Sequence, residues 1–544
     1  RSLAPLNRIG DIQGSRLENG VVRTPDGFAD AYRQFCDGGW NGLPFDPAYG
    51  GQGLPWVLGT AVQEMCDGAN MAFGLCPLLT KAAVDALHNF GTPAQKAKYL
   101  APLVHGRWSG TMNLTEPQAG SDVGALRTRA VRNGEHYRLT GQKIFITYGD
   151  HDMSENIIHM VLARTPDAPP GVKGLSLFIV PKVLVGADGR LGARNDIRTV
   201  SLEHKMGING SPTAILAYGD DSGAFAELLG EENRGIEYMF AMMNNARLSI
   251  GIEGLGIAER SYQMARDYAR LRVQSRDAAG NDHQPVPIIR HPDVRRMLMT
   301  MRASIDAMRG LIYYTAAAID RARHLPGAKD RAAWLGEAEL LTPVAKAWCT
   351  DTACTITSLA VQVHGGLGFI EQTGVAQLYR DARIAPIYEG TNGIQANDLV
   401  GRKLMRDNGA SAEAFFAHIR MTAAEAAGEG GILSSIGAAL AQSLGAVEQA
   451  TQWLTATWPK DKRLALSGAT PYLHLFGLVT GAFLLTRQAL AAQTRRNGDD
   501  GGFLAGKVTT ARFFCDNLLT AAPGLATAVT AGGPSTLALA EDLF

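Results

Sequence analysis

The spacing of apolar residues changes twice along this chain of 544 residues, and the change limits the folds it can adopt. Up to about residue 106, apolar positions recur at helical spacing. From about 107 to 230 they form short alternating runs separated by Gly and Pro, and after 231 the helical spacing returns. This pattern predicts a mainly α protein with an inserted antiparallel β domain. The expected strands are 136–139, 143–147, 157–162, 175–180 and 214–218.

Four domains follow from these changes. They are an N-terminal helical domain at 1–106, a middle β domain at 107–230, a helical bundle at 231–405 and a further helical domain at 406–544. The third domain contains the longest helical patterns, over 236–272, 292–324 and 334–364. The fourth is rich in Ala, Leu and Gly.

Charge and cysteine content exclude several classes of protein. The chain has 52 Lys and Arg against 52 Asp and Glu, so no net field would attract nucleic acid or an anionic membrane. Its six cysteines show no metal-binding spacing, which indicates a reducing compartment and no metal site. The apolar stretch at 473–485 is expected to be too short to span a membrane.

The start of the chain shows no secretion signal, so a cytoplasmic location is expected. It opens on Arg1 rather than methionine, which suggests that the first helix of the natural protein is missing. Residues 501–507 match the beginning of a phosphate-binding P-loop. However, Val508 follows where Ser or Thr should bind magnesium, and no strand precedes, so no phosphate site is predicted there.

One carboxylate, Glu389, stands in a setting suited to chemistry. It lies between Tyr388 and Gly390, and the helix breakers Pro386 and Gly390 predict a loop between two helices. Burial in such a loop would raise the pKa of Glu389, as a general base for a weakly acidic C–H bond requires. The alternative is a surface glutamate in an ordinary turn.

The segment from Arg380-Asp381-Ala382 to Tyr388-Glu389-Gly390-Thr391 resembles the active-site loop of the acyl-CoA dehydrogenases, which are flavoproteins. The resemblance implies that Glu389 is the catalytic base. It also implies that Tyr388 and Gly390 contact the substrate and that Thr391 contacts the cofactor.

Residues 111–123 resemble the flavin loop of the same family, in which Thr-Glu-Pro precedes Ala-Gly-Ser-Asp. By this resemblance Leu114 and Thr115 touch the isoalloxazine ring. Gly120 and Ser121 line the junction of the flavin phosphate and CoA, so Ser121 belongs to both the cofactor site and the substrate site. The alternative is an ordinary Pro/Gly turn before a strand.

The strand at 143–147 also matches the family, in which an aromatic residue covers one flavin face and a hydroxyl two residues later bonds N5. Those residues are Phe145 and Thr147 here, and alternation along a strand places them on one side. The family often has Trp where this chain has Phe145. A core phenylalanine is the alternative.

The remaining residues implied by the resemblance follow helices. Arg272 would meet the flavin pyrophosphate of a neighbouring subunit, and Gln274 is assigned with it, although the sequence departs from the family after Arg272. Gln362, Gly365 and Gly366 would pack on the same diphosphate; the alternative is that the glycines end a helix, and both interpretations can hold at once. Arg247 would lie near the acyl-CoA, unless it faces solvent.

Together these matches imply a β-barrel middle domain, a four-helix bundle and an extra helical C-terminal domain, as in the long branch of the family. They imply an FAD-dependent desaturase of a short or thioether acyl-CoA, such as 3-(methylthio)propionyl-CoA. They also imply a homodimer that passes electrons to an electron-transfer flavoprotein.

Two alternatives remain. One is an acyl-CoA oxidase, which shares the base and the flavin. The other is a DNA-associated stress-response flavoprotein, which would need a basic face that the C-terminal domain does not display, because Arg495 and Arg496 are offset by Asp499 and Asp500.

Overall fold

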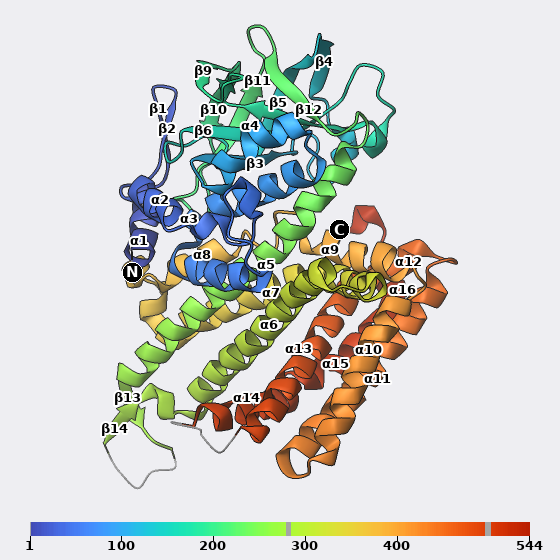
Figure 1. Ribbon diagram of the computed structural model, residues 1–544. Helices are drawn as coiled ribbons and strands as arrows, with labels where there is room; N and C mark the ends of the chain where they lie inside the picture. The colour runs from blue at the N-terminus through green and yellow to red at the C-terminus, as the bar shows by residue number, and fades with distance from the viewer. Residues whose placement is uncertain (1, 279–283, 496–501) are drawn as a thin grey trace. The chain divides into compact units, whose positions relative to one another are not determined.

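The computed structural model describes residues 2–278, 284–495 and 502–544 (Figure 1). Gly501, at the start of the P-loop-like run, therefore lies outside the described residues. The chain divides into two compact units, Arg1–Ser249 and Ile250–Phe544.

The first unit begins with helices. Their bounds are α1 Leu3–Gln13, α2 Phe28–Asp37, α3 Trp56–Phe90 and α4 Pro93–Val104, with a short hairpin of β1 Arg16–Glu18 and β2 Val21–Arg23. Helix α4 begins after a capping residue, Thr92, whose hydroxyl accepts from the Gln95 backbone N–H at 3.2 Å. Helix α3 is kinked at Asn70, whose backbone leaves helical geometry.

The same unit contains an eight-stranded sheet, a half-barrel in which the strand order is β10-β11-β5-β12-β7-β6-β3 and β4 pairs with β5. Its strands are β3 Trp108–Asn113, β4 Arg129–Asn133, β5 His136–Thr147, β6 Asn156–Ala163, β7 Ser176–Pro181, β10 Ile197–Leu202, β11 Thr213–Tyr218 and β12 Ala224–Leu229. A separate pair joins β8 Val183–Val185 to β9 Leu191–Arg194.

Two sequence predictions about the sheet need correction. The expected strands 136–139 and 143–147 are one strand, β5, which continues through Gly141. The sheet is also not wholly antiparallel, because β3 pairs in parallel with β6. The buried face of β5 contributes Leu139 and Ile146 to a core that includes Phe178 and Leu216. This core supports the strand on which Phe145 and Thr147 stand.

Helix α5, Gly235–Leu271, continues past the boundary between the two units. The second unit then contains α6 Pro292–His324, α7 Ala328–His364, α8 Val375–Ala382, α9 Asn392–Asp398 and a π-helical turn at Leu399–Leu404. A small hairpin of β13 Val273–Arg276 and β14 Pro285–Pro287 follows α5. The long helices match the predicted ranges closely, because their apolar stripes are continuous.

The remaining helices form the extra C-terminal layer, drawn in orange and red in Figure 1. They are α10 Ala410–Gly428, α11 Gly431–Thr457, α12 Lys462–Ser467, α13 Ala469–Thr494, α14 Phe503–Asn517, α15 Ala522–Ala531 and α16 Gly533–Thr536. Aromatic side chains hold the layer together. The rings of Phe415 and Phe476, for example, stack with their centroids 5.8 Å apart.

Helix α13 corrects the prediction that its apolar stretch is too short to span a membrane. Among the described residues, this 26-residue helix is long and apolar enough to do so, with a mean hydropathy of 1.4 over its most apolar window. However, 78% of that window is buried within the protein, as in the core helix of a globular domain.

Candidate active site

The predicted base, Glu389, lies in the turn between α8 and α9, as the sequence indicated. Its backbone is left-handed, with φ at +54°, and Gly390 follows with φ at +82°. A non-glycine residue in this region costs on the order of 1–3 kcal/mol, so the surrounding structure must hold it there. The side chain is half-buried.

Three side chains around the turn hold that conformation. Thr391 caps α9, because its hydroxyl accepts from the Ile394 N–H at 3.2 Å. The Gln395 amide donates to the carbonyl oxygens of Glu389 and Gly390, at 3.4 and 3.2 Å. The Asn392 side chain accepts from Lys346 Nζ at 2.8 Å. The peptide groups on both sides of Gly390 are thereby fixed in orientation.

Tyr388, predicted to contact substrate, donates a hydrogen bond from its hydroxyl to Glu253 of α5. Glu253 is fully buried. Sequence reasoning did not identify this second carboxylate. The available signal was a lone acid in the apolar stretch Ile250 to Ile257 of a helix, because a buried acid needs a partner.

The other predicted residues of the second unit are exposed. Arg272 and Gln274 lie where α5 ends and β13 begins, with Arg272 Nη2 3.5 Å from Gln274 Oε1. Gln362, Gly365 and Gly366 lie at the end of α7. Gly365 is the helix cap, with φ at +61°, so the helix-end interpretation of this glycine is confirmed. A Cβ added to Gly365 or Gly366 would meet no atom within 4 Å.

In the first unit, the predicted flavin loop lies against strand β5. The Thr115 carbonyl accepts from the Ile144 N–H at 2.9 Å, and the Leu114 carbonyl accepts from Lys143 Nζ at 2.8 Å. Leu114, Thr115 and Phe145 are therefore close together. Gly120 and Ser121 follow a tight turn and are exposed, and a Cβ on Gly120 would meet no atom within 4 Å.

Phe145 has an unusual conformation for an aromatic residue in a strand. It is 58% exposed, its φ is +59°, and the pairing of β5 with β11 shifts register beside it. Such a bulge re-aims a side chain. The core-phenylalanine alternative is wrong, because the ring lies outside the core. Phe145 and half-buried Thr147 flank the buried Ile146.

A buried ion pair supports this loop, and sequence reasoning missed it. Lys143 Nζ lies 2.9 Å from Glu116 Oε1, and both side chains are almost fully buried. Burial alone would raise the pKa of Glu116, but the charge of Lys143 and hydrogen bonds from Thr128 and the Arg127 N–H lower it to about 2. Burial lowers the pKa of Lys143 to about 8, despite the attraction of Glu116.

Arg247 is buried, with 2% of its surface exposed, so the solvent-facing alternative is wrong. Its guanidinium carbon lies 5.9 Å from the centre of the Phe240 ring. Its neighbours in the helix, Ala246 and Leu248, are also buried. An arginine in such a position indicates a functional or structural anion partner.

Each unit by itself offers groups that suit part of a flavin. The first unit offers an exposed aromatic face at Phe145, a hydroxyl at Thr147 and the open Gly120–Ser121 turn. The second offers exposed glycine backbone at Gly365 and Gly366, where the added Cβ has open space. Among the described residues, no group of three or more His, Cys, Asp or Glu is placed to hold a metal ion.

Comparison with family models gives four matches along the chain. Residues 19–107, 111–220 and 233–404 match the N-terminal, middle and C-terminal domains of acyl-CoA dehydrogenases. Residues 415–540 match a model described as acetyl-CoA dehydrogenase C-terminal like.

Two curated relatives cover nearly the whole chain. The chain is 50% identical to 3-methylmercaptopropionyl-CoA dehydrogenase of Ruegeria pomeroyi, over 98% of this chain and 91% of the relative. It is 33% identical to a butyryl-CoA dehydrogenase of Syntrophomonas wolfei, over 100% of this chain and 91% of the relative.

Solved structures share the fold. The Caenorhabditis elegans protein ACDH-11, solved in complex with C11-CoA, has a TM-score of 0.78 at 21% identity and covers 95% of this chain and 84% of its own. A structure described under the electron transferring flavoprotein of Acidaminococcus fermentans has a TM-score of 0.61 at 27% identity, with coverages of 75% and 94%.

Proposed function

We propose that this chain, which belongs to the acyl-CoA dehydrogenase family, desaturates a short acyl-CoA with a thioether in its chain, namely 3-methylmercaptopropionyl-CoA. One observation carries the choice of substrate. It is the 50% identity to the Ruegeria pomeroyi enzyme of that name over 98% of the chain. The relative named for butyryl-CoA is only 33% identical over a similar length.

The protein is an oxidoreductase that acts on acyl-CoA thioesters, and the cofactor of its family is FAD. When bound, FAD accepts the hydride that leaves the β-carbon of the substrate. Phe145, Thr147, Leu114 and Thr115 would hold its ring system. Arg272, Gln274, Gln362, Gly365 and Gly366 would meet its diphosphate, with Thr391 as a further contact.

The chain's own groups account for the proton transfer. An α C–H beside a thioester is a very weak acid, so hydrogen bonds to the thioester oxygen must stabilise the developing enolate. The Glu389 N–H lies in the left-handed turn and is proposed to donate one of them, while Gln395 holds the two peptide groups that follow it. The Glu389 carboxylate then takes the α-proton, and the fixed left-handed turn keeps it in one position.

Partners and location complete the proposal. The exposed Arg272 and Gln274 support a homodimer in which these residues reach the cofactor of the second subunit. An electron-transfer flavoprotein is the proposed electron acceptor, supported by the fold shared with the Acidaminococcus fermentans structure. The six cysteines, all free, support a cytoplasmic location.

The substrate is tested with a panel of acyl-CoA thioesters and an artificial electron acceptor. We expect kcat/KM for 3-methylmercaptopropionyl-CoA to exceed that for butyryl-CoA. The acyl chain of butyryl-CoA has no thioether sulfur. A preference for butyryl-CoA, or for a long or aryl chain, would reject the substrate while leaving the family intact. Peroxide release under air at the rate of dye reduction would favour an oxidase instead.

A further inference from the structure

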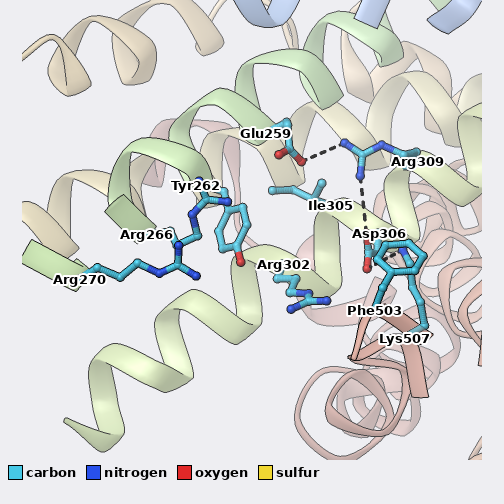
Figure 2. A pocket seen from close by; sticks show the side chains of 10 residues that line it. All are labelled: Glu259, Tyr262, Arg266, Arg270, Arg302, Ile305, Asp306, Arg309, Phe503 and Lys507. Atoms are coloured by element: carbon cyan, nitrogen blue, oxygen red, sulfur yellow. Dashed lines mark hydrogen bonds and ion pairs between the residues drawn. The ribbon is translucent and has the colours of Figure 1, made fainter. Parts of the chain in front are cut away.

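A cavity of about 360 Å³ lies within the second unit, between α5, α6 and the first two turns of α14 (Figure 2). Its volume is in the range of sites that bind small molecules, about 300–1,000 Å³. None of the residues that line it belongs to the candidate active site. The cavity thus joins the helical bundle to the extra C-terminal layer.

The lining is strongly basic. Five of its side chains are Arg or Lys and two are acidic, which leaves a net charge of three positive. The two carboxylates are neutralised at one end. Glu259 accepts from Arg309 at 2.9 Å, and Asp306 lies 3.0 Å from Lys507 Nζ. Lys507, the lysine of the P-loop-like run, is therefore already paired.

The other end carries three guanidinium groups from two helices, those of Arg266, Arg270 and Arg302. Arg266 forms an ion pair with Asp267, an exposed residue outside the lining. Among the described residues, neither Arg270 nor Arg302 forms an ion pair with a carboxylate. Like charges in one cavity repel, and a bound anion would offset that repulsion.

Tyr262 lies between two of these arginines. The guanidinium carbon of Arg266 lies 5.9 Å from the centre of the Tyr262 ring, and Figure 2 shows the phenol between Arg266 and Arg302. The hydroxyl can donate to an anion that the arginines hold. Gly506 allows Arg302 to approach α14, since a Cβ there would lie 2.9 Å from Arg302 Nη2.

An aromatic face completes the cavity. Phe503 is 62% exposed at the start of α14, and Lys507 Nζ lies 5.5 Å from the centre of its ring. An exposed ring beside a cluster of arginines suits a ligand that has both a planar ring and a phosphate. Arginine is preferred over lysine for such planar, two-point contacts with phosphate oxygens.

We propose that this cavity binds a nucleoside phosphate, with the phosphate against Arg266, Arg270 and Arg302 and the base against Phe503. The ligand would bridge the bundle and the C-terminal layer, and its binding would couple these two parts of the unit.

The test uses the FAD-loaded enzyme with its substrate site filled by enoyl-CoA product. FAD and CoA each contain a nucleotide, so filling both of their sites prevents AMP from binding there. Equilibrium dialysis with AMP is expected to show one saturable site per chain. Arg302→Gln is expected to lower the affinity for AMP at least about tenfold, because a hydrogen bond from a charged group is lost. Arg296→Gln is the matched control, because Arg296 lies on α6, is exposed and pairs with Asp293 outside the cavity.

Two further measurements separate the phosphate from the base. Phe503→Leu is expected to lower the affinity for AMP by about fivefold or more and to leave the affinity for pyrophosphate unchanged. Thermal midpoints of all variants within about 2 °C of wild type show that they fold. The proposal is overturned if AMP does not bind, if Arg296→Gln matches Arg302→Gln, or if pyrophosphate binds as tightly as AMP.

Discussion

Replacing Lys143 by Met is the most informative perturbation of the flavin loop. Lys143 Nζ donates to the Leu114 carbonyl at 2.8 Å and pairs with Glu116 at 2.9 Å, and its side chain is fully buried. Methionine keeps the length and the apolar stem but removes the charge. The substitution therefore leaves a buried carboxylate without its cation and a carbonyl without its donor.

The expected cost follows from those contacts. Breaking a buried ion pair from one side typically costs about 3–5 kcal/mol. Glu116 keeps four donors, the Arg127 N–H at 2.7 Å, the Gln118 amide at 2.8 Å, the Thr128 N–H at 3.0 Å and the Thr128 hydroxyl at 2.5 Å. We therefore expect the lower end, about 3 kcal/mol. For a unit of this size that corresponds to a fall in Tm of roughly 6–12 °C.

The assay is thermal unfolding at one fixed excess of FAD, with FAD content measured after gel filtration. We expect the variant to lose both stability and FAD, because Leu114 and Thr115 are no longer held. The double variant Lys143→Met with Glu116→Gln removes the unpaired charge and should recover at least half of the lost stability. If Lys143→Met lowers Tm by less than 2 °C, or the double variant is no better, the ion pair does not support the loop.

Three further predictions concern single contacts. Gly366→Ala should leave Tm unchanged, because the added methyl meets no protein atom within 4 Å. It should lower the affinity for FAD at least tenfold in a fluorescence titration. Burial lowers the pKa of His159 to about 3 from an ordinary 6.5, so only the unfolded chain binds this proton at pH 4–6, and stability falls as the pH drops. Between pH 4 and 6, His159→Gln should reduce the slope of the free energy of urea unfolding against pH by about 1.4 kcal/mol per pH unit. An unchanged slope would show that His159 titrates normally. Tyr388→Phe removes the donor to buried Glu253 and should cost about 1–2 kcal/mol in the same assay; a neutral result would mean that other partners of Glu253 suffice.

The sequence predicted those parts of the fold that depend on regular spacing. Helix α6 spans 292–324 as expected, because Pro at its first turn and a continuous apolar stripe define both ends. The strand around Phe145 was also predicted, but its left-handed backbone was not. A β-bulge depends on how two strands pair, and neither strand alone encodes that register.

In the candidate site, too, features that depend on nearby residues were predicted and features that depend on distant residues were not. Glu389 was placed in a loop by Pro386 and Gly390, which act locally. Its support from Gln395 is also local, whereas the Asn392–Lys346 contact depends on tertiary packing of α7 against α9. Glu253 and Lys143 were missed for that reason. Each is an isolated charge whose role appears only when its partner, far away in the sequence, lies within hydrogen-bond distance.

The central claim is that Glu389 removes the α-proton, and Glu389→Gln tests it most directly. The amide keeps the size of the side chain and the Glu389 N–H but cannot accept the proton. Anaerobic stopped-flow measurement of flavin bleaching by 3-methylmercaptopropionyl-CoA isolates this step from reoxidation. We expect unchanged FAD content and a fall in the reduction rate of at least about 10²- to 10⁴-fold. Reduction at a rate close to wild type, in a variant with full FAD, would contradict the assignment of the base.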